Sequence, residues 1–325
     1  MSDKNNTDKI FTNPLSDVVA ADPYVKYTDG YFYATYTECD RITLFRSRSF
    51  DTVVKDEKKV IFRAGDDIKA NIWAPEFHYI PSLKKWFVYA CGLPAEDTLG
   101  SMRMFCLESE GEDLFGDYYF AGLTSESSVA IDQTVFFDDA SGSIYTAFSE
   151  FTEDGQVITF AAMDGPAKVS DRRLRLSKPE FEWETRGPVP DKDPRVNEGP
   201  IFLLQGGKLS LIYSASGCWS RWYCLGLIEY TGEDFTEKNM LNPANWIKHK
   251  EPIFKEGNDV YGVGHCSFFT SPDGETTWIA YHGMATPDAG EDGRYMYAQP
   301  VSFDENNLPV IGEPVERGKR YFAPN

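Results

Sequence analysis

Short runs of alternating hydrophobic and polar residues recur along the whole chain, whereas the periodicity of an amphipathic helix is almost absent. Such alternation predicts strands that bury one face. The five clearest runs cover residues 31–36, 85–89, 143–148, 209–213 and 277–281. Turn sequences rich in Gly, Asp and Ser precede four of them, as β-hairpins require. The pattern therefore predicts a nearly all-β chain.

The hairpins repeat along the chain. Each begins with a polar residue, runs through an apolar strand to a turn, and returns through an aromatic-rich strand. The leading residues are 54, 56, 66 and 67 positions apart, and they are Asp22, Glu76, Asp132, Glu198 and His265. Further strand-like stretches follow the hairpins, for example at 42–46, 102–106, 157–161 and 223–228. They predict a third and a fourth strand for each unit.

Five such units predict an all-β fold, a five-bladed β-propeller of four-stranded antiparallel blades around a central channel. We expect one domain over residues 1–325, with an N-terminal extension at 1–13 and a closing segment at 305–325. Because each innermost strand begins at the mouth of the channel, the five leading residues are expected to form a ring there. Four carboxyls and one imidazole would then share one pocket.

The composition excludes several classes of partner. The 51 Asp and Glu against 32 Lys and Arg give a net charge of −19, and no basic stripe could neutralise phosphates, so nucleic acid is not expected. No apolar run reaches the ~18 residues of a membrane span, so no membrane partner is expected either. The N-terminus lacks the pattern of a secretory signal, which predicts a cytoplasmic location. Six irregularly spaced cysteines without a Cys-x-x-Cys pair argue against a zinc site.

A ring of carboxyls is unfavourable unless it serves a function, because neighbouring like charges and burial both oppose ionisation. Glycoside hydrolysis needs two carboxyls, one ionised to activate water and one protonated to supply the leaving oxygen. Asp22, Asp132 and Glu198 are the candidates. Taken singly, each could simply begin a strand or cap a turn, but their shared position in the repeat favours a catalytic role.

Six motifs, in order along the chain, carry a resemblance to a known family. They are Asp22-Pro, Asn71-Ile-Trp-Ala-Pro-Glu76, Ala130-Ile-Asp-Gln-Thr-Val-Phe136, Val196-Asn-Glu-Gly-Pro200, Tyr261-Gly-Val-Gly-His265 and Tyr281-His282. Together they resemble glycoside hydrolase family 43, whose members are five-bladed propellers, over about residues 13–315. Ile131-Asp-Gln-Thr, Val196-Asn-Glu-Gly-Pro and Ala298-Gln-Pro are together most similar to the exo-acting α-L-arabinofuranosidases.

The resemblance implies an inverting mechanism and a role for each acid. Asp22 matches the general base, Glu198 the general acid, and Asp132 the residue that tunes the pKa of the acid and orients the sugar. Base and acid are then expected about 6.5–9.5 Å apart, which leaves room for a water. The charge of Asp132 is expected to keep Glu198 protonated near neutral pH.

Three further residues gain roles from the same resemblance. Arg294 matches an arginine that contacts substrate hydroxyls and the carboxylates; a solvated arginine is the alternative. Trp73 matches a flat wall for the sugar, and a core tryptophan is the alternative. His265 matches a histidine that holds a structural calcium ion on the channel axis, largely through waters, and an axial histidine without a metal is the alternative. No cofactor is expected for the chemistry itself.

The expected substrate is an arabinose-containing oligosaccharide that loses its terminal α-L-arabinofuranose. Gln133, Val263 and Cys266 depart from the pattern of many relatives, which leaves β-xylosidase or endo-arabinanase activity on a xylose- or arabinose-containing glycan open. A propeller that binds glycan without cleaving it is the alternative from another class.

The loops at 92–101 and 186–197 are expected to decide between a closed pocket and an open groove, and a pocket would indicate exo action. Trp219, Arg221 and Trp222 are expected on an outer strand or loop, with a part in a sugar subsite as the alternative.

Overall fold

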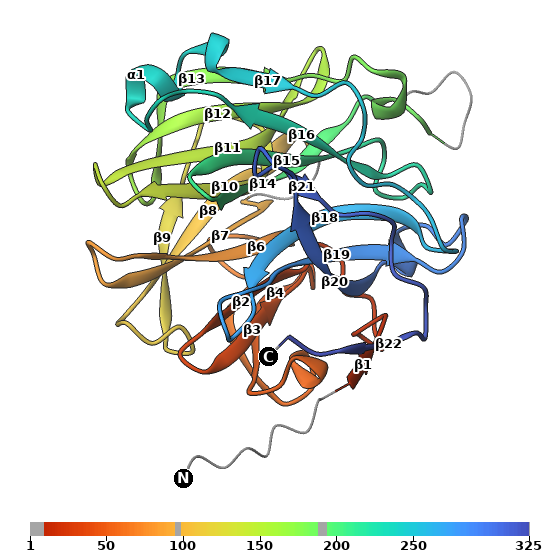
Figure 1. Ribbon diagram of the computed structural model, residues 1–325. Helices are drawn as coiled ribbons and strands as arrows, with labels where there is room; N and C mark the ends of the chain where they lie inside the picture. Colours follow the sequence, from red (N-terminus) through yellow and green to blue (C-terminus); the bar gives the residue numbers. More distant parts are fainter. Residues whose placement is uncertain (1–9, 95–98, 188–193, 325) are drawn as a thin grey trace.

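The computed structural model describes residues 10–94, 99–187 and 194–324. Five four-stranded antiparallel sheets make up the fold, each with its strands in sequence order (Figure 1). The first strand of every sheet contacts the first strands of both neighbouring sheets, in a closed circle of five. This arrangement confirms the predicted five-bladed propeller.

The strands of each blade run from the centre outwards. Blade 1 holds β2 (Tyr24–Thr28), β3 (Tyr31–Thr35), β4 (Arg41–Ser47) and β5 (Glu57–Arg63); blade 2 holds β6 (Ala70–Ile80), β7 (Lys85–Leu93), β8 (Arg103–Ser109) and β9 (Tyr118–Leu123); blade 3 holds β10 (Ala130–Asp138), β11 (Ser143–Thr152), β12 (Gly155–Gly165) and β13 (Lys168–Ser177); blade 4 holds β14 (Asn197–Gln205), β15 (Lys208–Ala215), β16 (Cys224–Tyr230) and β17 (Trp246–Lys248); blade 5 holds β18 (Tyr261–Thr270), β19 (Thr277–Met284), β20 (Tyr295–Phe303) and β21 (Pro309–Val310).

Helical structure is short in the described part of the chain. It consists of one α-helical turn, α1 (Glu237–Met240), and the 3₁₀ turns η1 (Phe50–Thr52), η2 (Leu99–Ser101), η3 (Glu182–Glu184), η4 (Pro243–Asn245) and η5 (Glu291–Gly293). None of the helices described is long and apolar enough to cross a membrane. The five predicted alternating runs fall on β3, β7, β11, β15 and β19, the second strand of each blade, although 31–36 extends one residue beyond β3.

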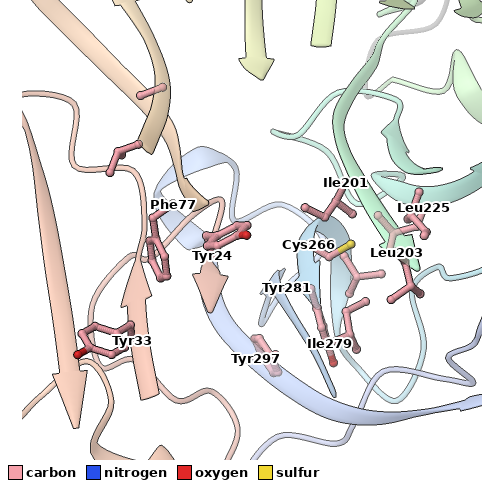
Figure 2. Close-up of a cluster of buried hydrophobic side chains, with 14 of the residues drawn as sticks. Tyr24, Tyr33, Phe77, Ile201, Leu203, Leu225, Cys266, Ile279, Tyr281 and Tyr297 are labelled. Atoms are coloured by element: carbon pink, nitrogen blue, oxygen red, sulfur yellow. The ribbon is translucent and has the colours of Figure 1, made fainter. Parts of the chain in front are cut away.

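Hydrophobic side chains between neighbouring blades form the core. Between blades 1 and 2 the rings of Tyr24 and Phe77 meet edge to face, with centroids 4.9 Å apart. Within blade 5, Tyr281 and Tyr297 stack at 5.7 Å, and the same cluster continues to Ile201 and Leu203 of blade 4 (Figure 2). Large aromatic rings fill the wedge between twisted sheets, which explains the high aromatic content of the sequence.

The two ends of the described chain meet beside blade 5. Strand β1 (Ile10–Thr12) pairs with β22 (Arg320–Phe322) in a separate two-stranded sheet. The side chain of Asn13 then donates to the carbonyl of Ala298 and accepts from its N–H, which fixes the incoming chain along β20. Within the segment expected to close the ring, β21 completes blade 5 and β22 pairs with the N-terminal strand. Of the expected extension at 1–13, residues 1–9 lie outside the described residues.

An irregularity recurs where the innermost strands begin. Each blade has a residue with a left-handed backbone here, with φ of 56°, 46°, 58°, 52° and 43° for Asp22, Ala74, Asp132, Gly199 and His265. Blades 2 and 5 each have a second one, Asn71 and Gly262, three residues earlier. In blades 2 to 5 a break in strand register accompanies this conformation. Bulges of this kind redirect side chains beside functional sites, and here they lie at one end of the channel.

The predicted ring was wrong in one member, Glu76. In blade 2 the left-handed residues are Asn71 and Ala74, and Glu76 lies two residues beyond Ala74 along the strand. Its carboxylate lies 2.8 Å from Nε2 of His78, and it does not line the cavity that the other four leading residues share. Aligning the repeats on their polar residue rather than on the bulge caused the error.

Candidate active site

A cavity of about 420 Å³ opens at the end of the propeller where the innermost strands begin. Its lining includes every site residue proposed from the sequence: Asp22, Trp73, Asp132, Glu198, His265 and Arg294. All five blades contribute to this set, and Arg294 comes from the β19–β20 connection. The repeat thus brings together residues that are up to 272 positions apart in sequence.

Asp22 is surrounded by donors and positive charge. Its Oδ2 accepts a hydrogen bond of 2.6 Å from the hydroxyl of Thr37. Its Oδ1 lies 3.2 Å from Nδ1 of His265 and 3.4 Å from Nη1 of Arg294. Burial alone would raise the pKa of Asp22, but the His265 and Arg294 charges outweigh it and hold that pKa far below the usual range. Asp22 is therefore ionised at neutral pH.

His282 fixes the backbone of Asp22. The N–H of Asp22 donates to Nδ1 of His282 over 3.2 Å, and the same nitrogen lies 3.3 Å from Oδ1 of Asp22. Burial lowers the pKa of His282 to about 4, so the ring is neutral at neutral pH. The ring of Tyr223 stacks on it at 5.3 Å and 4°. The sequence motif contained His282 but gave it no role.

Glu198 lies in an environment opposite to that of Asp22. Burial raises its pKa to about 7, although two hydrogen bonds to the carboxylate oppose the rise. The hydroxyl of Tyr223 donates to Oε1 over 2.8 Å, and Nε2 of Gln156, from β12 of blade 3, donates to Oε2 over 3.0 Å. Glu198 can therefore keep a proton near neutral pH while Asp22 has lost its own.

Asp132 is linked to Glu198 through the backbone. Its Oδ2 accepts a 3.0 Å hydrogen bond from the N–H of Gly199. Burial raises the pKa of Asp132 to about 7, and the charges of Glu198 and Asp22 add to the rise. Two neighbouring carboxyls that both titrate near neutrality hold one proton as a pair. Burial, rather than the charge of Asp132, is thus the main cause of the raised pKa of Glu198.

The two substrate-contact candidates differ in how exposed they are. The Arg294 side chain is only 13% exposed and is aimed at Asp22, so it is not the solvated arginine that was the alternative. Trp73 is half-buried: one part packs against the apolar cluster of Cys91 and Met102, and another part lines the cavity. A tryptophan in this position can offer a flat apolar face to a sugar ring.

The calcium ion implied for His265 does not fit a direct set of protein ligands. In the described ranges no three His, Cys, Asp or Glu side chains are grouped so that they could hold a metal ion. Nδ1 of His265 faces Asp22 instead, and calcium prefers six or more oxygen ligands. A calcium ion held largely through waters, as the resemblance implies, stays a prediction.

Several further side chains line the cavity that sequence reasoning left out or gave no role. They include Thr37, Cys39, Gln156, Cys218 and Glu291. Thr37 connects two blades, because its hydroxyl donates to Asp22 and accepts from the N–H of Ala74. Of the two loops expected to shape the mouth, 95–98 and 188–193 lie outside the described residues.

Comparison with known proteins agrees with this geometry. Residues 11–309 match the family described as Glycosyl hydrolases family 43. An extracellular exo-α-(1→5)-L-arabinofuranosidase of Streptomyces avermitilis is 35% identical over 95% of this chain, which spans 64% of that relative's length. A Streptomyces chartreusis enzyme of the same name is 36% identical over 84% of this chain and 82% of its own. The crystal structure of a Lactobacillus brevis α-L-arabinofuranosidase superposes with a TM-score of 0.83 at 29% identity, covering 95% of this chain and 98% of that one.

These relatives correct the predicted location. Both Streptomyces enzymes are named extracellular, which contradicts the cytoplasmic location expected from the N-terminal residues. A polar N-terminus is weak evidence of location, because a leader is a separate segment that the folded domain does not need.

Proposed function

The chain belongs to the family 43 glycosyl hydrolases, and on that basis we propose that it releases terminal α-L-arabinofuranosyl residues from arabino-oligosaccharides with inversion at the anomeric carbon. One observation carries the proposal: a single cavity holds an ionised carboxylate, Asp22, and a buried carboxyl, Glu198, whose pKa is raised to about 7. That pair is what hydrolysis of a glycosidic bond requires. The names of the Streptomyces and Lactobacillus relatives support arabinofuranose as the sugar.

In the proposed reaction Glu198 gives its proton to the glycosidic oxygen as the bond from that oxygen to the anomeric carbon breaks. A water attacks the opposite face of the anomeric carbon and passes a proton to Asp22. The released arabinose has the inverted configuration. Return of the proton from Asp22 to Glu198 through solvent restores the enzyme. Arg294 holds the charge of Asp22 in place and offers donors to substrate hydroxyls.

Two p-nitrophenyl glycosides test the choice of sugar. We expect kcat/KM for the α-L-arabinofuranoside to exceed that for the β-D-xylopyranoside by at least about tenfold, since a pocket shaped for one ring excludes the other. Proton NMR of the first product from an arabino-oligosaccharide should show the inverted anomer. A preference for the xyloside would assign β-xylosidase activity instead, and binding without any hydrolysis would assign a glycan-binding propeller.

Tyr223→Phe tests the protonation of Glu198. The phenol stabilises the charged carboxylate, so its removal should raise the pKa of Glu198 further, by about one unit. The acid then stays protonated to higher pH, and the alkaline limb of the kcat/KM profile should move up by the same amount. Tyr89→Phe is the matched control, because its buried hydroxyl donates to the carbonyl of Pro166. An alkaline limb that does not move, or moves down, would contradict the assignment.

A further inference from the structure

A second cavity, of about 610 Å³, lies among the connections of blade 4. Three segments line it: the one leading into β14, the one between β15 and β16, and the one between β17 and β18. Because the strands of a blade are antiparallel, all three connections lie at the end where β14 begins. Glu198 lies at the same end, so the second cavity and the catalytic cavity open on one face of the propeller.

One connection, 216–223, takes part in both cavities. Cys218 and Trp219 line the catalytic cavity, and Arg221 and Trp222 line the second. The two tryptophans are three positions apart in sequence, so their Cα atoms are at most about 10 Å apart. Trp219 is 41% exposed at this boundary. A chain-like ligand that leaves the catalytic cavity past Trp219 would reach the second cavity directly.

The lining of the second cavity combines aromatic faces with fixed hydrogen-bonding groups. The guanidinium groups of Arg186 and Arg221 lie 5.4 and 5.0 Å from the centre of the Trp222 ring. Arg221 also forms a two-point ion pair with Glu256, at 2.8 and 3.1 Å. The indole N–H of Trp183 donates to the carbonyl of Lys250, which fixes that ring. Flat apolar faces beside both donors and acceptors suit the C–H faces and hydroxyls of sugars.

The charges of the lining argue against a polyanionic ligand. Arg186 and Arg221 are paired with Glu182 and Glu256, and Lys250, Lys255 and Glu251 also line the cavity, so four basic residues face three carboxylates. A phosphate-rich partner would need an excess of unpaired positive charge. An uncharged ligand rich in hydroxyls can use the paired groups as they stand.

The wall of this cavity is held in place by a buried ion pair. Glu184 is fully buried and lies 2.8 Å from Nζ of Lys248. Its second oxygen accepts the backbone N–H groups of Glu180 and Phe181, and thereby anchors the segment that carries Trp183 and Arg186. A site that is already formed loses little entropy when a ligand binds.

We propose that the second cavity binds the sugar residues beyond the scissile bond, that is, the part of the arabino-oligosaccharide that remains after the terminal residue is released. The inference rests on the proposed function. It adds that the enzyme also binds the part of the substrate beyond the sugar that is removed. Binding energy from this remote part can hold the reacting bond in register. Longer oligosaccharides are then better substrates than aryl arabinosides.

Trp222→Ala tests this role. The measured quantity is the ratio of kcat/KM for an α-1,5-linked arabinotetraose to kcat/KM for p-nitrophenyl α-L-arabinofuranoside. We expect the ratio to fall about tenfold, which corresponds to the loss of one aromatic sugar contact. Arg186→Ala, which removes an exposed side chain with little risk to the fold, should lower the same ratio by a smaller factor. Tyr119→Ala is the matched control, because Tyr119 is 45% exposed on β9 and lines neither cavity.

The outcomes separate the two proposals. If the wild type cleaves the aryl arabinofuranoside but the ratio is unchanged in Trp222→Ala, the second cavity does not bind substrate and the proposed function stands. If the wild type cleaves no arabinofuranoside, the proposed function itself fails. Calorimetric titration of arabinotetraose into Glu198→Gln and into Glu198→Gln/Trp222→Ala gives a readout without turnover. Weaker binding to the double variant supports the inference, and equal binding overturns it.

Discussion

Glu198→Gln is expected to reduce kcat/KM for arabino-oligosaccharides by about 10³–10⁴-fold, the upper part of the ~10²–10⁴-fold that a general acid usually contributes. An alkoxide is a poor leaving group, so a sugar oxygen needs the proton that glutamine cannot give. Because p-nitrophenolate leaves as a stable anion without a proton, kcat/KM of the same variant on the aryl arabinofuranoside should fall only about 10–100-fold. The measurement is kcat/KM on both substrates at one pH.

Asp22→Asn supplies the contrast. A general base acts on the attacking water whatever the leaving group is. The kcat/KM of this variant should therefore fall by a similar factor on both substrates. Equal losses for Glu198→Gln on the two substrates would contradict its assignment as the acid.

Thermal unfolding at pH 8 controls for damage to the fold. Because the pKa of Glu198 is raised by burial to about 7, above its value in the unfolded chain, the stability it contributes falls as pH rises through that range. Glutamine removes this penalty, so the Tm of Glu198→Gln at pH 8 should equal or exceed that of the wild type.

The blades could be predicted because their signal is local. Alternation along 85–89 or 209–213 reports which face of a strand is buried, and a turn such as 205–207 fixes where the chain reverses. The three acids were picked from the repeat, in which Asp22 and Asp132 hold the left-handed position and Glu198 lies one residue before it. Trp73 and Arg294 came from the family resemblance instead. No long-range contact had to be known for either step.

Glu76 shows where local reasoning ends. A left-handed residue lies near the start of the innermost strand in every blade, and in blade 2 Asn71 and Ala74 adopt this conformation while Glu76 does not. Residue type alone does not show a positive φ at alanine, so the polar residue was chosen instead. The shared proline that follows Asp22, Ala74 and Gly199 was the signal that would have aligned the repeats correctly.

The partners of the acids could not be predicted for a different reason. Tyr223 precedes β16 and Gln156 lies on β12 of the neighbouring blade, yet both donate to Glu198. Such contacts depend on how the blades are rotated against one another, and this rotation is set by side-chain packing across the whole interface. The pKa of Glu198 depends on this packing, because the packing sets its burial and its hydrogen-bond partners. The second cavity depends on it too, because the cavity forms between connections of blade 4.

Glu184→Gln is expected to lower the free energy of unfolding by about 3 kcal/mol, because the buried ammonium of Lys248 then keeps only the half-exposed carboxylate of Glu180, 3.3 Å away. Glu184 is fully buried, and its Oε1 also accepts from Nδ2 of Asn197 and from the hydroxyl of Tyr213. A glutamine amide group in this place would direct its N–H donors toward the donors that now bind the carboxylate. The measurement is Tm by calorimetry, for which the expected drop is on the order of 5–10 °C.

The matched variant is Glu184→Gln/Lys248→Met. Removing both charges leaves no unpaired ion, and replacing a buried pair by neutral groups is often close to neutral in stability. The double variant should therefore recover at least half of the loss. If it is instead as unstable as the sum of the two single variants, the two groups act independently, and Glu184 stabilises the segment through its hydrogen bonds to Asn197, Tyr213 and the backbone rather than through the ion pair.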